Sequence, residues 1–121
     1  MEVIEKRRGH YLGTEIDGKW WRRYRKDGFL ARGLGEYWIE NSFLYFHRHL
    51  TVNPIVIPLY DVSEIKIGKW HSGSWAGGKP VVKILWEKDN RKLCSGFVLS
   101  ANKQETELLV EEIRALCKKH N

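Results

Sequence analysis

Residues 35–65 read GEYWIENSFLYFHRHLTVNPIVIPLYDVSEI, and this stretch decides the fold. Apolar and polar side chains alternate over 35–40 and again over 43–48, which is the period of a strand with one buried face. The pair Asn-Ser at 41–42 lies between the two runs and is typical of a tight turn. The stretch therefore predicts a β-hairpin near the middle of the chain.

Two prolines bracket the next strand, 55–57. Proline has no amide hydrogen to donate, so this strand must be short or lie at a sheet edge, and Pro58 must lie at its end. A further strand is expected over 62–67, and Gly35 is expected at a bend where a side chain is poorly tolerated. The residues expected to share a face are Tyr37 with Ile39, Leu44 with Phe46, and Ile65 with Ile67, the last pair facing inward.

These residues form a longer pattern of a glycine, aromatic and aliphatic positions, and an Ile-Pro-Leu segment. The residues that carry it are Gly35, Tyr37, Trp38, Ile39, Leu44, Phe46, Ile57, Pro58, Leu59, Val62 and Ile65. The pattern resembles the core of GRAM domains and other bacterial pleckstrin-homology-like domains, and it covers about a quarter of the chain directly. The resemblance implies a pleckstrin-homology-like barrel of roughly seven strands closed by one helix. It also implies a protein that binds lipid headgroups, peptides or other proteins.

The rest of the chain is expected to complete a mainly β fold, a β-barrel or sandwich made of two nearly orthogonal antiparallel sheets. One hairpin is predicted from 20–26 with 29–33, and another from 81–87 with 92–99. Residues 1–18 show no clean period. They are expected to form a short strand or helix packed on the barrel, with frayed ends.

A helix is predicted over 102–118. Asn102 is a good N-cap, and Glu105 stands three residues on, at the spacing of a capping box. The apolar stripe expected to face the barrel is Leu108, Leu109, Ile113, Leu116 and Cys117. The cations expected in the last turn, where the helix dipole favours them, are Lys118, Lys119 and His120. With this helix, residues 1–121 are expected to form a single domain.

The net charge of +6 is concentrated in two segments. Six cations face one acid between residues 19 and 32, and seven cations face two acids between 66 and 92. The helical segment is near neutral. The positive field therefore belongs to the sheet, where it attracts anionic partners over a long range.

Two segments combine cations with aromatic residues and are the candidates for a contact surface. The run KWWRRYRK at 19–26 either packs its aromatics on the core with its cations in solvent, which we favour, or uses both to contact anions. The loop KWHSGSWAGGK at 69–79 places two tryptophans among small residues, which is typical of contact surfaces as well as of a loop folded over the core. The predicted binding residues are Arg23, Arg25, Lys69, Trp70, Trp75 and Lys79, with Arg23 and Arg25 on one strand face near Lys69 or Lys79.

No catalytic or metal-binding constellation is evident in the sequence. His47 and His49 share a strand face and have His71 or Cys94 as further donors, but two surface histidines are the favoured interpretation, so no metal and no cofactor are expected. His71 lies beside Ser72 without an evident acid partner. Cys94 and Cys117 are expected to be reduced, buried thiols.

The sequence thus predicts a non-enzymatic binding module with a basic surface. Its expected partner is an acidic protein segment or the anionic headgroups of a membrane. Single-stranded nucleic acid is a less favoured alternative, and a homo-oligomeric scaffold that adds strands edge to edge is another. The chain shows no signal peptide and no apolar run long enough for a transmembrane segment, so a cytoplasmic location is expected.

Overall fold

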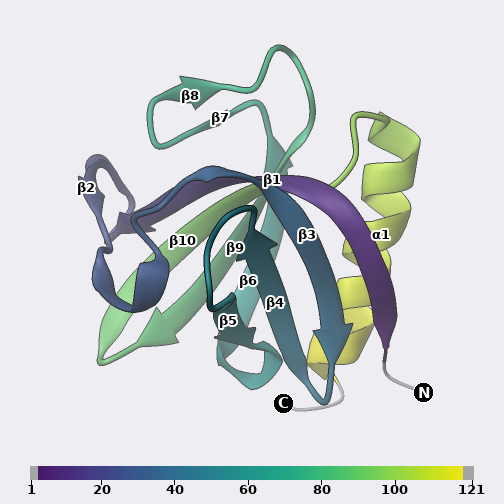
Figure 1. Cartoon of the computed structure of the whole chain (residues 1–121), viewed down its shortest axis with the longest axis horizontal. Coiled ribbons are helices and arrows are strands. Elements are labelled where there is room, and N and C mark those ends of the chain that lie inside the picture. The colour runs from purple at the N-terminus through teal and green to yellow at the C-terminus, as the bar shows by residue number, and fades with distance from the viewer. Residues whose placement is uncertain (1–2, 119–121) are drawn as a thin grey trace.

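Eight of the ten strands in residues 3–118, the part of the chain that the computed structural model describes, form one antiparallel sheet (Figure 1). Their order is β5-β4-β3-β1-β10-β9-β6, and β2 pairs only with β1. The elements are β1 (Ile4–Ile16), β2 (Lys19–Arg23), η1 (Lys26–Gly28), β3 (Gly33–Glu40), β4 (Phe43–Arg48), β5 (Ile55–Pro58), η2 (Leu59–Asp61), β6 (Val62–Gly68), β7 (Trp70–His71), β8 (Ser74–Trp75), β9 (Val81–Lys88), β10 (Arg91–Val98) and α1 (Lys103–Lys118). The fold is therefore mainly β with one C-terminal helix, as predicted.

The predicted central hairpin is confirmed as β3 and β4. Asn41 and Ser42 connect them with φ angles of 53° and 71°, the left-handed conformation that a two-residue hairpin turn requires. Gly35 is needed at its position, because a Cβ there would lie 2.2 Å from the carbonyl oxygen of His47. The residues Tyr37, Ile39, Leu44 and Phe46 are all buried.

The short strand between the prolines is also confirmed. β5 lies at one end of the sheet and ends at Pro58, which pairs with Phe43. The following strand, β6, lies at the other end. Its Ile65 is buried. Ile67 lies on the same face, opposite the core residue Val82, but it is 38% exposed because it lines an open cavity with Pro80 and Lys103.

The N-terminal segment is more central than the sequence indicated. β1 has thirteen residues and pairs with β3 through its first half and with β10 through its second half. β1 therefore joins the strands β3–β5 on one side to the strands β10, β9 and β6 on the other. The result is a single sheet that does not close, in place of the two expected sheets. Register shifts next to Ile4 and at Gly13, where φ is 107°, break the alternation of side chains that would have identified the strand.

The predicted hairpin of 20–26 with 29–33 is wrong. β2 instead folds back on β1 across the Asp17-Gly18 turn, with Arg23 opposite Glu15. The connection to β3 passes through η1 because Tyr24 and Phe29 are buried and pack ring against ring, with centroids 5.5 Å apart. Two large aromatic side chains on this connection thus enter the core, and they outweigh the tendency of Asp27-Gly28 to form a hairpin turn.

The core combines apolar side chains with one buried chain of hydrogen bonds. The hydroxyl of Tyr11 donates to the carbonyl oxygen of Phe29 at 2.5 Å and lies 2.6 Å from the Thr14 hydroxyl. Thr14 lies 2.7 Å from the hydroxyl of Ser95, which accepts a hydrogen bond from the Trp86 indole at 3.0 Å. The polar side-chain atoms of Tyr11, Thr14, Ser95 and Trp86 are thereby all hydrogen-bonded.

Helix α1 covers the core with Leu109, Val110 and Ile113. Its N-cap is confirmed, because the Asn102 side chain accepts a hydrogen bond from the Glu105 amide at 2.8 Å. Leu108 is 72% exposed, so its predicted place in the apolar stripe is wrong, whereas Cys117 is buried and both cysteines are free thiols. The cations predicted at Lys119 and His120 lie outside the described residues. Within residues 3–118, no helix has the length and apolar character to cross a membrane.

Candidate functional site

The β7–β8 hairpin, predicted as a loop, lies over the outer face of the large sheet and projects from it at the top of Figure 1. Outward-facing residues of β1, β9 and β10 form a small second core beneath it. Its members are Leu12, Val81 and Val98, with Ala76 packed against them. The face of the sheet opposite the main core is therefore buried only where this hairpin covers it.

Three polar contacts hold the hairpin down. The ring of His71 lies 2.8 Å, through Nε2, from the carbonyl oxygen of Gly13, and the Ser72 amide donates to the Glu15 carboxylate at 2.8 Å. Arg23 donates from Nη2 to the Ser72 carbonyl oxygen at 2.5 Å. All three contacts involve backbone atoms of β1 or of the hairpin, so they position the chain itself rather than one side chain.

Four exposed tryptophans lie on the two adjacent hairpins. Trp20 and Trp21 on β2 are 60% and 62% exposed, and Trp70 and Trp75 on the β7–β8 hairpin are 57% and 46% exposed. The rings of Trp70 and Trp75 pack together at 5.2 Å, and a Cβ on Gly73 would lie 3.4 Å from the ring of Trp20. We call these four residues the tryptophan face.

An open cavity of about 530 Å³ separates the two hairpins. Trp20 and Trp70 line it from the two sides, with Lys83 beside them. Glu15 and His71 also line this cavity, although the His71 side chain is fully buried. The tryptophan face therefore borders an open depression that contains charged groups as well as indole rings.

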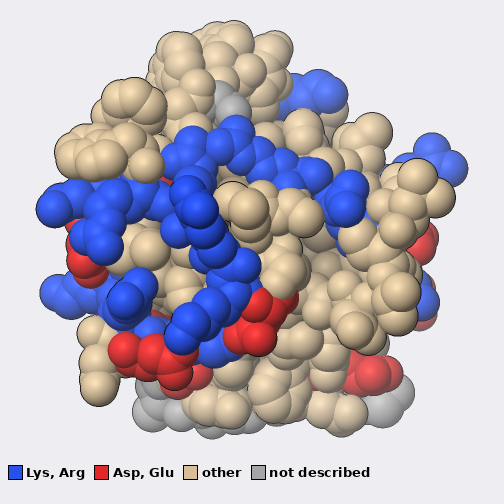
Figure 2. All heavy atoms as spheres, turned by 60° about the vertical axis from the view of Figure 1, so that its left-hand side comes forward, with Lys and Arg blue, Asp and Glu red and all other residues tan. Residues whose placement is uncertain are grey.

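Cations surround this region. Figure 2 shows Lys and Arg side chains in a nearly continuous blue arc, next to the protruding tan region at the top of the view. The side chains of Arg23 and Arg32 both lie against Gly13, where a Cβ would be 3.8 and 3.3 Å from their Nε atoms. The Lys88 ammonium pairs with Asp27 at 2.6 Å, which brings the two positively charged segments of the sequence together.

The structure brings together some of the predicted binding residues. Lys69, Trp70 and Trp75 are exposed and adjacent, with the Lys69 ammonium 5.9 Å from the Trp75 ring centroid. Arg23 lies beside this loop, as expected, but it is half-buried and engaged with Ser72. The predicted shared face of Arg23 and Arg25 is wrong, because β2 ends at Arg23 and Arg25 lies in the turn before η1.

The remaining predicted cation, Lys79, is exposed and lies near His10. Burial first, and then the positive charge of Lys79, lower the pKa of His10. The tryptophans at 20 and 21 were missed as site residues because the run 19–26 was interpreted as packed aromatics. That interpretation holds for Tyr24, which is buried, and fails for both tryptophans.

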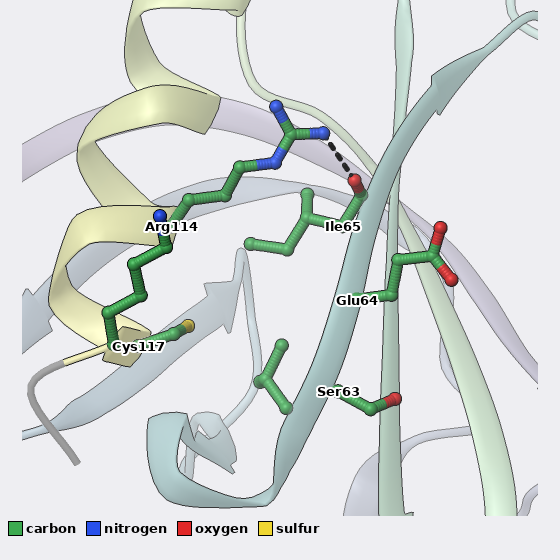
Figure 3. A pocket seen from close by; sticks show the side chains of 7 residues that line it. Ser63, Glu64, Ile65, Arg114 and Cys117 are labelled. Carbon is green, nitrogen blue, oxygen red and sulfur yellow. Dashed lines mark hydrogen bonds between the residues drawn. The ribbon is translucent and has the colours of Figure 1, made fainter. Parts of the chain in front are cut away.

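A second depression, of about 270 Å³, lies between α1 and β6 (Figure 3). Arg114 crosses it and donates from Nη2 to the Ile65 carbonyl oxygen at 2.6 Å. Cys117 lines it with its thiol, whose pKa is raised by burial. The Arg114 guanidinium is already hydrogen-bonded to β6, so it attaches the helix to the sheet and is not available to a ligand. This depression is therefore a weaker candidate for a ligand site.

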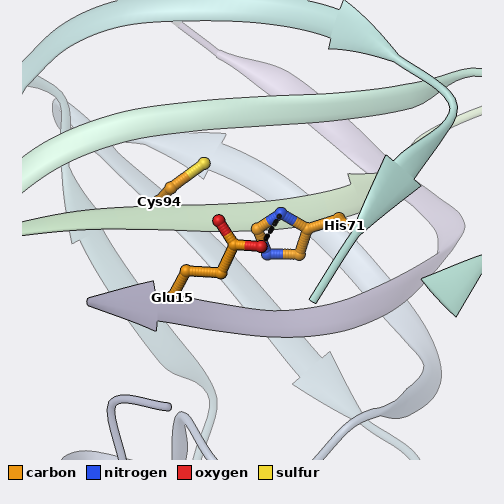
Figure 4. A group of neighbouring side chains, drawn as sticks. All are labelled: Glu15, His71 and Cys94. Atoms are coloured by element: carbon orange, nitrogen blue, oxygen red, sulfur yellow. Dashed lines mark ion pairs between the residues drawn. The ribbon is translucent and has the colours of Figure 1, made fainter. Parts of the chain in front are cut away.

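Glu15, His71 and Cys94 form the cluster of possible metal ligands in residues 3–118 (Figure 4). Their donor atoms lie within 4.8 Å of one another. Burial, followed by the nearby Glu15 carboxylate, raises the pKa of the Cys94 thiol to about 12. Burial lowers the pKa of His71, and the nearby Glu15 carboxylate opposes this shift.

Comparisons with known proteins add no functional assignment. No protein-family model matches the chain, and a search of curated proteins found no match. The arrangement of exposed tryptophans and cations is therefore the basis for assigning a function.

Proposed function

We propose that this protein is a non-enzymatic module that binds anionic membrane surfaces through the tryptophan face. The observation that carries the proposal is the exposure of Trp20, Trp21, Trp70 and Trp75 on two adjacent hairpins. An arc of Lys and Arg side chains lies beside them (Figure 2). An indole ring places an apolar body and a polar N–H at the boundary between water and hydrocarbon. Nearby Lys and Arg side chains each add about 1 kcal/mol of attraction to an anionic leaflet.

The shape of the surface favours a membrane over an acidic protein segment. The β7–β8 hairpin projects from the body of the protein (Figure 1), and a protruding tip reaches a flat lipid surface more readily than it encloses a peptide. Peptide recognition uses grooves or open strand edges. The depression between the hairpins is instead lined by polar groups such as Glu15, Ser72 and Lys83.

Nucleic acid is a poorer fit for the same rings. Stacking of bases requires free aromatic faces placed along a positively charged groove. Trp70 and Trp75 pack against each other at an interplanar angle of 50°, and Trp20 and Trp21 meet edge to face at 84°. These contacts occupy part of the surface that bases would use.

One further observation fits a protein at a cytosolic membrane face. Both cysteines remain thiols, which fits a reducing compartment. The cytosolic leaflet is also the anionic one that positive side chains prefer.

Vesicle sedimentation tests the proposal. The wild-type protein is expected to bind vesicles containing phosphatidylserine, to bind neutral phosphatidylcholine vesicles weakly, and to lose affinity when salt is raised from about 50 to 300 mM. The double variant Trp70→Ala/Trp75→Ala is expected to bind about tenfold more weakly, because two indoles no longer enter the interface. Leu108→Ala removes an apolar side chain that is more exposed than either tryptophan but lies on α1, and it is the matched control.

The absence of binding to anionic vesicles at both salt concentrations would overturn the proposal. Equal binding by the wild type and the double tryptophan variant would do the same. Parallel measurements with an acidic peptide and a single-stranded oligonucleotide assign the surface to one of the alternatives if either binds and vesicles do not.

A further inference from the structure

Three strands bring Glu15, His71 and Cys94 to one point beneath the tryptophan face (Figure 4). Glu15 on β1 and Cys94 on β10 are directly opposite each other in the antiparallel ladder. His71 comes from β7 and lies over β10 at Gly96, where a Cβ would be 2.3 Å from the imidazole ring. The absence of a side chain at Gly96 is therefore what allows the imidazole to approach the other two residues.

The imidazole is oriented with one nitrogen free. A carbonyl oxygen only accepts hydrogen bonds, so the contact of His71 Nε2 with the Gly13 carbonyl at 2.8 Å puts the proton on Nε2. In the neutral ring, Nδ1 then carries a lone pair, and it has no hydrogen-bond partner within residues 3–118. The His71 side chain is fully buried, and a buried polar atom without a partner is destabilising.

An ion pair with Glu15 does not provide a hydrogen-bond partner for His71 Nδ1. Nδ1 lies 3.7 Å from the Glu15 carboxylate, which is beyond hydrogen-bond distance. The same carboxylate oxygen already accepts the Ser72 amide at 2.8 Å.

We propose that Glu15, His71 and Cys94 bind a divalent transition-metal ion of the Zn²⁺ class. Zn²⁺ takes nitrogen, sulfur and carboxylate ligands in tetrahedral sites, and a ligating histidine usually donates its other N–H to a carbonyl or carboxylate. Bond lengths of about 2.0–2.3 Å place neighbouring tetrahedral ligands roughly 3.3–3.7 Å apart. An oxygen and a nitrogen ligand at about 2.0–2.1 Å are about 3.3–3.4 Å apart, so the Glu15–His71 separation of 3.7 Å must shorten by about 0.3–0.4 Å on binding.

Charge and access are consistent with the site. One carboxylate and one thiolate neutralise a divalent ion, and the thiol proton of Cys94 passes to solvent when the metal binds. Glu15, whose side chain is 14% exposed, lines the open cavity of about 530 Å³ between the hairpins, and this cavity provides a path for the ion toward the buried His71 ring. The ion joins β7 to the sheet, so it also fixes Trp70, the residue before His71, whether or not the tryptophan face binds membranes.

The test uses full-length protein without a polyhistidine tag, treated with a chelator and then titrated with Co²⁺ and with Zn²⁺. One equivalent of Co²⁺ is expected to bind and to give the d–d absorption of a tetrahedral site, together with a thiolate-to-cobalt charge-transfer band. Zn²⁺ is expected to displace it. Cys94→Ala is expected to abolish the charge-transfer band, and His71→Ala and Glu15→Gln are each expected to weaken Zn²⁺ binding at least about tenfold.

The matched controls are Cys117→Ala, which removes the other buried thiol, and His49→Gln, which removes an exposed imidazole. Both are expected to bind Co²⁺ as the wild type does. The proposal is overturned if the wild type binds no equivalent of Co²⁺ or Zn²⁺, or if Cys94→Ala keeps the charge-transfer band. Glu15→Gln preserves the size of the side chain, so it reports on the site even if a smaller residue at position 71 or 94 unfolds the protein.

Discussion

At the scale of single residues, Arg23 connects the two hairpins of the tryptophan face. It donates to the carbonyl oxygens of Trp20 and Ser72, one on each hairpin. Arg25, two residues on, is exposed and follows the end of the strand. Two arginines that look equivalent in the sequence therefore differ, because one stabilises the backbone of the site and the other lies in solvent.

Replacement of these arginines separates the two roles. Arg23→Gln is expected to lower the free energy of unfolding by about 1–3 kcal/mol, because the charged hydrogen bonds to the exposed Trp20 carbonyl and to the half-buried Ser72 carbonyl are lost. It is also expected to speed amide hydrogen exchange in the β7–β8 hairpin. The matched variant Arg25→Gln is expected to change stability by less than about 0.5 kcal/mol. Equal effects of the two variants in urea unfolding contradict the assigned role of Arg23.

Tyr37 predicts how stability depends on alkaline pH. Its hydroxyl donates to the Leu99 carbonyl oxygen at 2.9 Å, and burial raises its pKa to about 12. In the unfolded chain this hydroxyl titrates near its ordinary value of about 10. Above that pH the unfolded state binds fewer protons than the folded state, so the stability from Tyr37 is full below pH 10 and is lost as pH rises toward 12.

Urea unfolding at a series of pH values from 8 upward measures this effect. The wild type is expected to lose stability above pH 10, and Tyr37→Phe is expected to lose less over the same range. The difference between the two curves cancels the titration of lysines common to both proteins. Parallel curves contradict the link between Tyr37 ionisation and stability.

At the scale of elements, α1 is attached to the sheet by its apolar face and by one arginine. Ile113 is fully buried against the core, whereas Leu108, on the same helix, is 72% exposed. Arg114 reaches the Ile65 carbonyl oxygen of β6, an end strand of the sheet (Figure 3). The helix therefore both closes the core and satisfies a backbone group that the end strand leaves unpaired.

The placement of the helix is tested by a pair of substitutions. Ile113→Ala is expected to lower the free energy of unfolding by about 2–5 kcal/mol, because it leaves a cavity in the core. Leu108→Ala is expected to change it by less than about 0.5 kcal/mol, since the side chain is in solvent. Chemical denaturation of the two variants measures both values. A negligible effect of Ile113→Ala contradicts the packing of α1.

At the scale of the whole molecule, the ends of the sheet are protected against pairing with another copy. β5 is short and lies between Pro54 and Pro58, and β6 is covered at Ile65 by Arg114. β2, which pairs only with β1, carries the exposed charges of Lys19 and Arg22. Prolines, short strands and charges are the usual means by which proteins prevent edge-to-edge association.

The protein is therefore expected to be a monomer in solution. Light scattering during size-exclusion chromatography is expected to give the mass of one chain, with no change on dilution. A dimer whose population rises with concentration contradicts this expectation and favours the scaffold alternative. Arg114→Ala then shows whether β6 is the strand involved.

Local sequence determined the elements whose signals are short in range. Four local signals were sufficient to predict their elements, because each depends on neighbours within a few residues. They are the alternation over 35–48, the turn at Asn41-Ser42, the prolines around β5 and the capped apolar stripe of α1. Lys69, Trp70 and Trp75 could be identified as a surface for the same reason. Their tryptophans stand among small residues with no apolar periodicity to bury them.

Only the tertiary structure decided which distant segments meet. It placed β1 between β3 and β10, turned β2 back on β1 and brought Trp20 next to Gly73. It also brought Glu15, His71 and Cys94 together, although no ligand spacing in the sequence links them. These arrangements depend on strand pairing and on burial of Tyr24 and Phe29, and such long-range contacts leave no periodic signal in the chain.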